Sequence, residues 1–170
     1  MSYKLNDNRI NIYRASQYIN NHKMFLHIIF NIYTLTDNAC KIYPKYFSWY
    51  WQKVVPAIIN GTRDAIMITF DEEVAGAVLV KKEDGEKKIC TLYVDEKYRN
   101  KGFGTILLKE AFGFLETTKP LITLGSDRLE IFSSIISKYD WKQTQILPNG
   151  YYNDQTNELV FNGTIIWIKK

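Results

Sequence analysis

The segment from Ile89 to Leu108 constrains the fold of this chain more than any other part of the sequence. It begins with apolar, strand-forming residues up to Val94, continues as a charged turn and ends in an amphipathic helix. The turn reads Arg99-Asn100-Lys101-Gly102-Phe103-Gly104, so two glycines and two basic residues stand at the helix start. Backbone N–H groups at such a helix start converge on one point and bind anions. The sequence therefore predicts a phosphate-binding turn between a buried strand and a helix.

Hydrophobic periodicity extends this strand–turn–helix unit to an order of β, α, α, β, β, β, α, β, α, β, β. The expected helices are Ser16–Tyr33, Phe47–Ile59, Gly102–Glu116 and one that Asp127 would cap, through Tyr139. The expected strands are Arg9–Arg14, Ala65–Phe70, Val74–Lys81, Lys87–Val94, Leu121–Leu124, Trp141–Leu147 and Glu158–Ile168. This order predicts an α/β fold with a central mixed sheet of about six to seven strands and helices on both faces.

Length and charge limit the function classes. A chain of 170 residues with 46% hydrophobic residues suits a single domain, residues 1–170. A net charge of +4 permits an anionic ligand and does not indicate nucleic acid as a partner. Cys40 and Cys90 match no metal-ligand spacing, so we expect free thiols and no metal. Few cysteines, no secretory leader and no apolar run long enough for a bilayer favour a cytoplasmic protein without a membrane partner.

Three phosphate-binding motifs compete for the glycine turn. A P-loop is excluded because the chain contains no Gly-Lys-Ser or Gly-Lys-Thr, and a Rossmann fingerprint fails because Leu107 stands where its third glycine belongs. The third motif, R/Q-x-x-G-x-G/A, is satisfied in full by Arg99–Gly104. Here the chain resembles the GNAT superfamily of acetyl-CoA-dependent N-acetyltransferases. The lead-in Leu92–Asp95, the helix start Ile106–Leu108 and the order of elements extend the resemblance over nearly the whole chain.

The resemblance implies an acyltransferase with acetyl-CoA as cosubstrate. The turn would bind the pyrophosphate, and the preceding strand would bind the pantetheine arm through its main chain. A neutral primary amine would attack the thioester directly in a ternary complex, while a backbone N–H polarises the carbonyl. The implied cofactor-binding residues are Leu92, Tyr93, Val94, Arg99, Asn100, Lys101, Gly102, Phe103, Gly104 and Thr105.

The sequence departs from the family in its acid–base residues. Ile136 occupies the position where many members carry a tyrosine that protonates the leaving thiolate, and Tyr139 lies one turn further on. Lys87 and Lys88 stand where some members carry a glutamate base. Turn or capping roles are the better interpretation of the nearby carboxylates, Glu83, Glu86 and Asp127, so the catalytic residues stay unassigned. The alternative function is a catalytically silent CoA-binding sensor or interaction module.

The acceptor would be a small-molecule or peptide amine, bound beside the first two helices and the loop of residues 149–157. The segment Tyr43–Trp51 is dense in aromatic residues. One interpretation of this aromatic run is a cage for a cationic or aromatic amine. Helix packing is the better interpretation for Phe47, Tyr50 and Trp51, and an exposed aromatic could equally mark a homodimer surface. The expected pocket walls are Tyr43, Tyr46, Trp49, Tyr151 and Tyr152.

Overall fold

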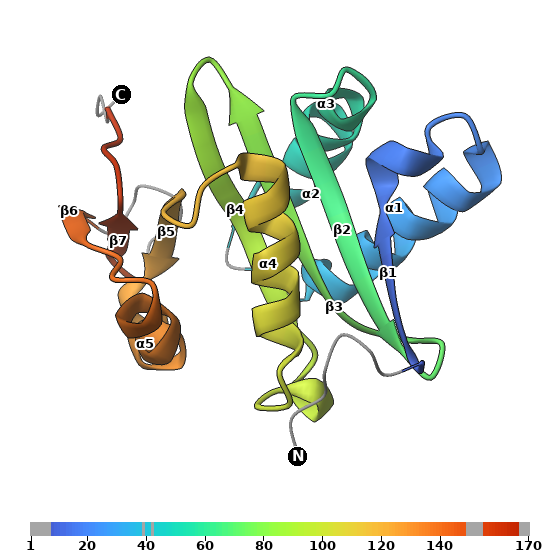
Figure 1. The fold of residues 1–170 in the computed structure, drawn as a ribbon. Helices are drawn as coiled ribbons and strands as arrows, with labels where there is room; N and C mark the ends of the chain where they lie inside the picture. Colours follow the sequence, from blue (N-terminus) through green and yellow to red (C-terminus); the bar gives the residue numbers. More distant parts are fainter. Residues whose placement is uncertain (1–7, 39, 42, 149–154, 167–170) are drawn as a thin grey trace.

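The computed structural model describes residues 8–38, 40–41, 43–148 and 155–166. A seven-stranded mixed sheet runs through them in the order β1-β2-β3-β4-β5-β7-β6 (Figure 1). All neighbouring strands are antiparallel except the pair β4 and β5. The strands are β1 (Ile10–Arg14), β2 (Arg63–Phe70), β3 (Glu73–Glu83), β4 (Glu86–Val94), β5 (Leu121–Gly125), β6 (Gln143–Leu147) and β7 (Glu158–Phe161). The predicted fold class is confirmed.

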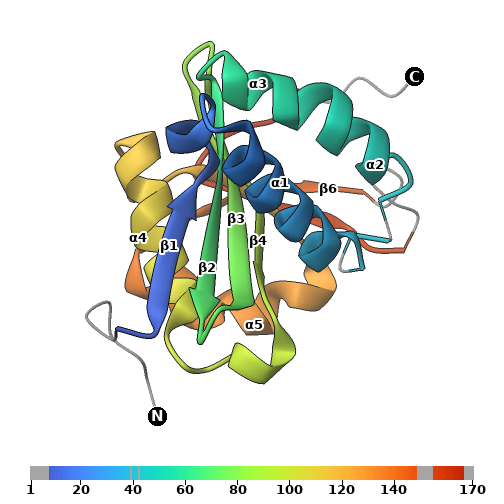
Figure 2. The same ribbon diagram turned by 90° about the vertical axis from the view of Figure 1, so that its right-hand side faces the viewer.

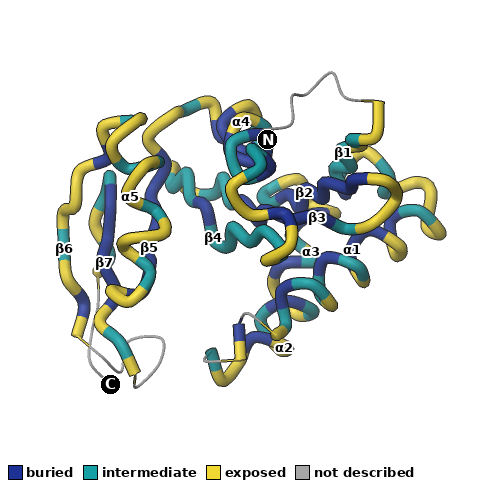
Figure 3. The backbone as a smooth tube through the Cα atoms, turned by 90° about the horizontal axis from the view of Figure 1, so that it is seen from below, coloured by how far each residue is buried: buried dark blue, intermediate teal, exposed yellow. Residues whose placement is uncertain are grey.

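Helices cover both faces of the sheet. Helices α1, α2 and α3 lie on one face, which we call the acceptor face, and α4 and α5 lie on the other (Figure 3). In the described residues none of the helices is long and apolar enough to cross a bilayer. Their bounds are α1 (His22–Asp37), α2 (Tyr46–Trp49), α3 (Val55–Ile59), α4 (Phe103–Leu115) and α5 (Leu129–Lys138).

The central strands are buried on both faces. In β2, Ile66 and Ile68 pack toward α4, whereas Ala65 and Met67 pack toward α1 and α3. Successive side chains of a strand point to opposite faces, so one strand contributes to two separate cores. This explains why β2 and β3 are near-continuous apolar runs rather than alternating ones.

Strands β4 and β5 diverge soon after they meet. Their parallel ladder contains two residue pairs, Lys88 with Leu121 and Ile89 with Ile122. Cys90 is the extra residue of a β-bulge at this point, because Val80 pairs with Ile89 while Leu79 pairs with Thr91. The bulge turns β4 away from β5, and the gap between the two strands is visible beside α4 in Figure 1.

The first helix begins later than the sequence predicts. Ser16 does not cap it, because its hydroxyl donates to the buried carboxylate of Asp64 at 2.6 Å and its N–H donates to the same group at 3.0 Å. Residues Ala15–Tyr18 form a 3-10 turn, and α1 starts at His22 with the Asn21 side chain accepting from the Met24 N–H at 3.1 Å. The Ser16 hydroxyl, which the local sequence predicts as a helix cap, is thus bound to Asp64, a residue distant in the sequence.

The second helical segment continues through Pro56 to Ile59, where the sequence predicts its end. Helices α2 and α3 are joined by a π-helical turn, Tyr50–Val54, and form one path along the acceptor face (Figure 2). The Val55 N–H donates to the Tyr50 carbonyl, five residues back. A proline removes an N–H and clashes with the preceding turn of an α-helix, and the wider π-helical turn accommodates it.

Two further boundaries differ from the prediction. Asp127 does not cap α5, because a 3-10 turn, Ser126–Arg128, leads from β5 into the helix without a side-chain capping bond. Strand β7 ends at Phe161, where Asn162 adopts a φ of 61° and its side chain donates to the Pro120 carbonyl at 3.0 Å. The positive φ turns the chain away from the sheet, so the predicted strand is wrong for residues 162–166, and residues 167 and 168 lie outside the described residues.

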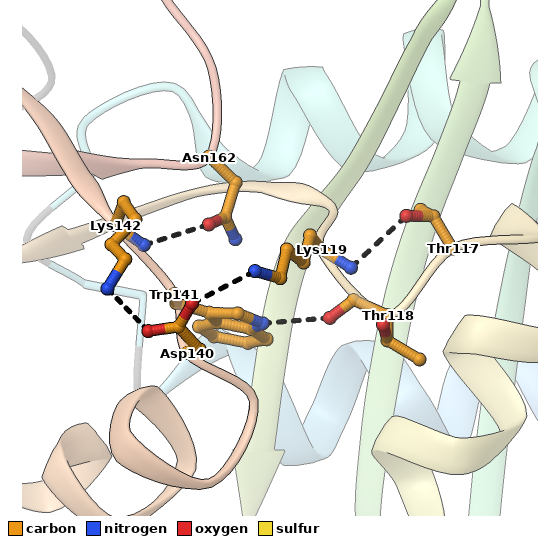
Figure 4. A network of polar contacts seen from close by, with 7 residues as sticks. All are labelled: Thr117, Thr118, Lys119, Asp140, Trp141, Lys142 and Asn162. Atoms are coloured by element: carbon orange, nitrogen blue, oxygen red, sulfur yellow. Dashed lines mark hydrogen bonds and ion pairs between the residues drawn. The ribbon is translucent and has the colours of Figure 1, made fainter.

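A polar network holds the half of the sheet beyond the gap against the α4–β5 loop (Figure 4). The buried Trp141 indole donates to the Thr118 carbonyl at 2.8 Å, and Lys119 binds Asp140 at 3.2 Å. Asp140 also binds Lys142, whose N–H donates to the Asn162 side chain at 3.0 Å. These contacts join β6 and the end of β7 to the α4–β5 loop, in addition to the β5–β7 ladder.

Candidate active site

The turn between β4 and α4 has the backbone geometry of an anion cradle. A 3-10 turn, Glu96–Tyr98, leads to Asn100 and Gly102, whose φ angles are 59° and 95°. A φ of 95° suits glycine because it has no Cβ. Gly102 is the N-cap of α4, and no side chain caps the helix there. The first N–H groups of the helix, which lack intrahelical acceptors, are therefore left to a ligand or to water.

The predicted cofactor residues of this turn differ in what they can offer. The Phe103 side chain is buried and packs against Phe70 and Tyr98, with ring centroids 5.7 and 5.5 Å away. It anchors the turn in the core, so only its backbone can contact a ligand. By contrast, Gly104 and Thr105 are partly exposed in the first turn of α4. Of Phe103, only the main chain is therefore available for the predicted cofactor contact.

The two basic side chains of the turn bind the protein itself. The Arg99 Nε donates to the Val94 carbonyl at 3.1 Å, and its guanidinium lies 5.6 Å from the Tyr93 ring centroid. The Lys101 ammonium donates to the Lys97 carbonyl at 2.6 Å. Arg99 therefore ties the turn to the end of β4, and both cations stay exposed enough to act on an anion at the helix start.

The divergence of β4 and β5 opens a cavity of about 610 Å³. Its floor comes from the two strands, and α2 with the loop before it and the start of α5 form its walls. Of the predicted pantetheine strand, Leu92 and Tyr93 line the cavity, whereas Val94 and the glycine turn lie outside it. Val94 links the two, because it follows the cavity-lining Tyr93 and lies 3.8 Å from the point where a Cβ on Gly104 would lie.

Three of the predicted acceptor aromatics, Tyr43, Tyr46 and Trp49, line the cavity. Tyr46 is almost fully buried, its hydroxyl donates to Thr36 at 2.7 Å, and burial raises its pKa. Tyr151 and Tyr152 lie outside the described residues. The packing prediction is correct for Tyr50, which is fully buried.

One aromatic of this run lies where the packing prediction does not place it. Phe47 is 62% exposed and touches Tyr33 only by its ring edge. The packing prediction for Phe47 is therefore wrong, because α2 turns this side chain outward.

Glu158 is a carboxylate that the sequence analysis missed. It starts β7, is buried on the acceptor face, and accepts from the Tyr43 hydroxyl at 3.3 Å. Its other oxygen, Oε2, has no hydrogen-bond partner among the described residues. Burial raises the pKa of this carboxyl. Its strand partner is Gly125, which lines the cavity. The signal in the sequence is a charged residue heading a short apolar run, Glu158–Phe161.

Comparison with known proteins identifies the family. The family model for acetyltransferases of the GNAT family matches residues 26–124, more than half of the chain. The chain belongs to the GNAT family. It is therefore an acyltransferase, and the prediction made from the glycine turn is confirmed. No curated protein matches the sequence.

Solved GNAT structures share the fold at low sequence identity. Ard1 from Thermoplasma volcanium superposes with a TM-score of 0.67 at 19% identity, over 90% of this chain and 95% of that one. A GNAT family acetyltransferase from Elizabethkingia anophelis with acetyl-CoA bound gives 0.60 at 18%, over 91% and 97%. Arabidopsis thaliana Naa50 in complex with the bisubstrate analogue CoA-Ac-MVNAL gives 0.61 at 16%, over 92% and 99%.

Helix α5 contains no tyrosine. Ile136 is partly buried and packs against the core, and the Tyr139 ring lies 5.0 Å from that of Phe112. Helix α5 and the turn before it present Phe132 and Arg128 to the cavity instead.

The carboxylates considered from the sequence lie beside basic side chains. Glu86 and Glu83 bind Lys81 at 3.0 and 3.7 Å, and the exposed Asp127 lies 3.9 Å from Arg128. Within the described residues, no three His, Cys, Asp or Glu side chains are grouped to hold a metal ion.

Proposed function

We propose that residues 1–170 form a single acetyltransferase-like domain that transfers an acetyl group from acetyl-CoA to a primary amine. The observation that carries this proposal is the gap between β4 and β5, which opens beside an uncapped helix start. The acetyl-CoA bound to the neighbour from Elizabethkingia anophelis and the bisubstrate analogue bound to Naa50 support the choice of cosubstrate. A cytoplasmic location and a homodimer stay predictions from the sequence.

In this proposal the donor half of the site is built from backbone. The pyrophosphate binds the free N–H groups around Gly102, Gly104 and Thr105, where the helix dipole adds to the charges of Arg99 and Lys101. The pantetheine arm lies in the gap and pairs with the main chain of Leu92–Val94 as an added strand would. No metal takes part. Asn100 contributes through its left-handed backbone, which lets the turn reverse direction.

The reaction centre lies next to the bulge at Cys90. Past Ile89, β4 has left its ladder with β5, so backbone N–H groups on that edge are open to a thioester carbonyl. The amine nitrogen attacks this carbonyl carbon, the C–N bond forms, and the C–S bond breaks to release the CoA thiolate. A thiolate is a good leaving group because the pKa of its thiol is about 8.5, so the reaction can proceed without a tyrosine at Ile136.

The proton of the attacking amine needs an acceptor, and we assign this role to Glu158 acting through Tyr43. Tyr43 lines the cavity and already donates its hydroxyl proton toward Glu158 at 3.3 Å. As the amine gives a proton to the Tyr43 oxygen, the Tyr43 proton passes to Glu158, and the tyrosine stays neutral. A carboxylate with a raised pKa is a better base than an ordinary glutamate.

The test measures CoA binding and turnover separately. Calorimetry gives the affinity for CoA, and release of the CoA thiol is followed with acetyl-CoA and a panel of amino acids, peptides, polyamines and aminoglycosides. Tight CoA binding with thiol release on at least one amine is the expected result. Tight binding without release on any amine would indicate the silent CoA-binding module instead. Failure to bind CoA would contradict the proposal as a whole.

A further inference from the structure

Three cationic side chains stand in a row across the sheet at the closed end of the gap. Arg63 of β2 pairs with Lys81 of β3, and Lys81 pairs with Lys88 of β4. Directly paired residues of neighbouring strands lie side by side on one face of a sheet. All three line the cavity, and we call them the cationic row.

The cationic row faces the acceptor side rather than α4. Arg63 lies over the Trp49 ring, 5.7 Å from its centroid, and its Nη1 lies 3.6 Å from the Cys90 sulfur at the bulge. The next lysines along β3 and β4, Lys82 and Lys87, point to the opposite face, where they bind Glu116 at the end of α4 at 2.6 and 3.9 Å. Strand alternation thus separates two lysine pairs of the same chemistry onto opposite faces.

The charge around the cavity is strongly positive. Among the described residues that line it, Glu86 is the one carboxylate, against five cations: Lys45, Arg63, Lys81, Lys88 and Arg128. Lys81 is bound by Glu86 and Glu83, whereas Arg63 forms no ion pair with any described residue. Like charges paired directly across strands destabilise a sheet. An anion bound in the cavity would remove this repulsion.

The cationic row lies beside the proposed reaction centre, because the Arg63 Nη1 is 3.6 Å from the Cys90 sulfur at the bulge. Burial raises the pKa of the Cys90 thiol, and Arg63, Lys88 and Lys81 all act on that sulfur in the opposite direction. Cys90 is the bulge residue beside which the thioester would lie. An anion held by the row would therefore lie close to an amine that attacks beside the bulge.

We propose that the acceptor carries a carboxylate close to its primary amine, and that Arg63, supported by Lys81 and Lys88, binds this carboxylate. The inference rests on the proposed function and narrows its acceptor. The planar guanidinium of Arg63 suits a bidentate carboxylate. A positively charged cavity disfavours polyamines and aminoglycosides, so the cationic acceptor considered from the aromatic run is not the one that this structure favours.

The experiment compares acceptors that differ in one carboxylate. The pairs are glycine and glycinamide, β-alanine and β-alaninamide, and the peptides Ser-Asp-Ala-amide and Ser-Asn-Ala-amide, which sample three separations between amine and carboxylate. For each, kcat/KM is measured by thiol release, and binding to the CoA-loaded protein by calorimetry. Because charged hydrogen bonds contribute about 1.5–3 kcal/mol, we expect the carboxylate member of at least one pair to be favoured about tenfold or more.

Two variants on opposite faces of the sheet distinguish a specific effect of the cationic row from a general effect of positive charge. Arg63→Gln should reduce the preference for the carboxylate through KM and leave the affinity for CoA unchanged. Lys87→Gln, on the α4 face, should keep the preference. Equal binding of both members of every pair to the wild-type protein would overturn the inference, as would an equal loss for both members in Arg63→Gln. Failure of the wild-type protein to bind CoA would instead contradict the proposed function.

Discussion

Glu158 and Tyr43 are 115 positions apart in the sequence, yet their side chains meet at 3.3 Å on the acceptor face. A charged residue is seldom fully buried unless a partner or a function keeps it there. Glu158 has one hydrogen-bond partner for two buried oxygens among the described residues, which is poor compensation for a purely structural carboxylate. This poor compensation favours a catalytic role for Glu158 over a purely structural one.

We expect Glu158→Gln to lower kcat by about 10²–10⁴-fold and to remove the acid limb of the pH–rate profile, because glutamine cannot take the proton. In wild type the raised pKa places this limb at higher pH than an ordinary glutamate would. A kcat and a pH profile equal to those of wild type would exclude the relay.

The same variant has a predicted effect on stability. The folded-state pKa of Glu158 is raised, so its favourable contribution is complete below the unfolded pKa, about 4.3, and is lost as pH rises through the folded value. Glutamine does not titrate. Thermal unfolding should therefore show Glu158→Gln at least as stable as wild type at neutral pH. A large fall in Tm would point to a structural role instead.

Asp64 is a buried carboxylate with a structural role. It accepts from the Ser16 hydroxyl at 2.6 Å and from the N–H groups of Ser16 and Ala65 at 3.0 and 2.8 Å. Asp64→Ala should cost about 2–4 kcal/mol because two backbone donors lose their acceptor, whereas Ser16→Ala should cost about 1 kcal/mol. Urea unfolding measures both. Equal costs for the two variants would contradict this account of how Asp64 of β2 holds the 3-10 turn Ala15–Tyr18.

At the scale of elements, the position of β4 depends on a glycine in β3. A Cβ on Gly76 would lie 2.8 Å from the Tyr93 carbonyl oxygen and 3.0 Å from the Leu107 side chain. Three elements, β3, β4 and α4, are thus in close contact at the strand proposed to bind pantetheine.

We expect Gly76→Ala to cost about 1–3 kcal/mol and to weaken CoA binding, since β4 must shift to admit the methyl group. The matched control is Gly113→Ala, inside α4, where a Cβ would meet only the Arg14 side chain at 3.6 Å. That change should keep or raise stability because alanine favours helices. Unfolding and calorimetry with CoA check both. An unchanged affinity of Gly76→Ala for CoA would show that CoA binding does not depend on the position of β4.

The features that were predicted correctly depend on local patterns in the sequence. Hydrophobic periodicity predicted all seven strands and the helix after the turn, and the glycine motif indicated the family. The boundaries that failed involve partners distant in sequence: Asp64 takes the hydroxyl of Ser16, and Asn162 turns the chain toward Pro120. Helix α5 begins without the Asp127 cap because the chain leaves β5 through a 3-10 turn.

At the scale of the whole molecule, the donor and acceptor halves of the site differ in how they are encoded. The proposed CoA site is one continuous segment, Ile89–Thr105, so a sequence motif reveals it. The acceptor side is assembled from four strands and the loop before α2, and the cationic row exists only once the strand register pairs Arg63, Lys81 and Lys88. No local pattern marks these residues, which explains why the sequence analysis left the acceptor and the proton acceptor unassigned.

The central claim, that the turn into α4 binds the CoA pyrophosphate, is tested most directly at Gly104. A Cβ there would meet nothing closer than Val94 at 3.8 Å, and its φ is not in the left-handed region, unlike that of Gly102. Gly104→Glu and Gly104→Gln should therefore fold alike and differ in one charge. Calorimetry with CoA should show Gly104→Glu binding about tenfold or more weaker than Gly104→Gln, because a carboxylate would face the pyrophosphate. Equal affinity of the two variants and wild type would contradict the claim.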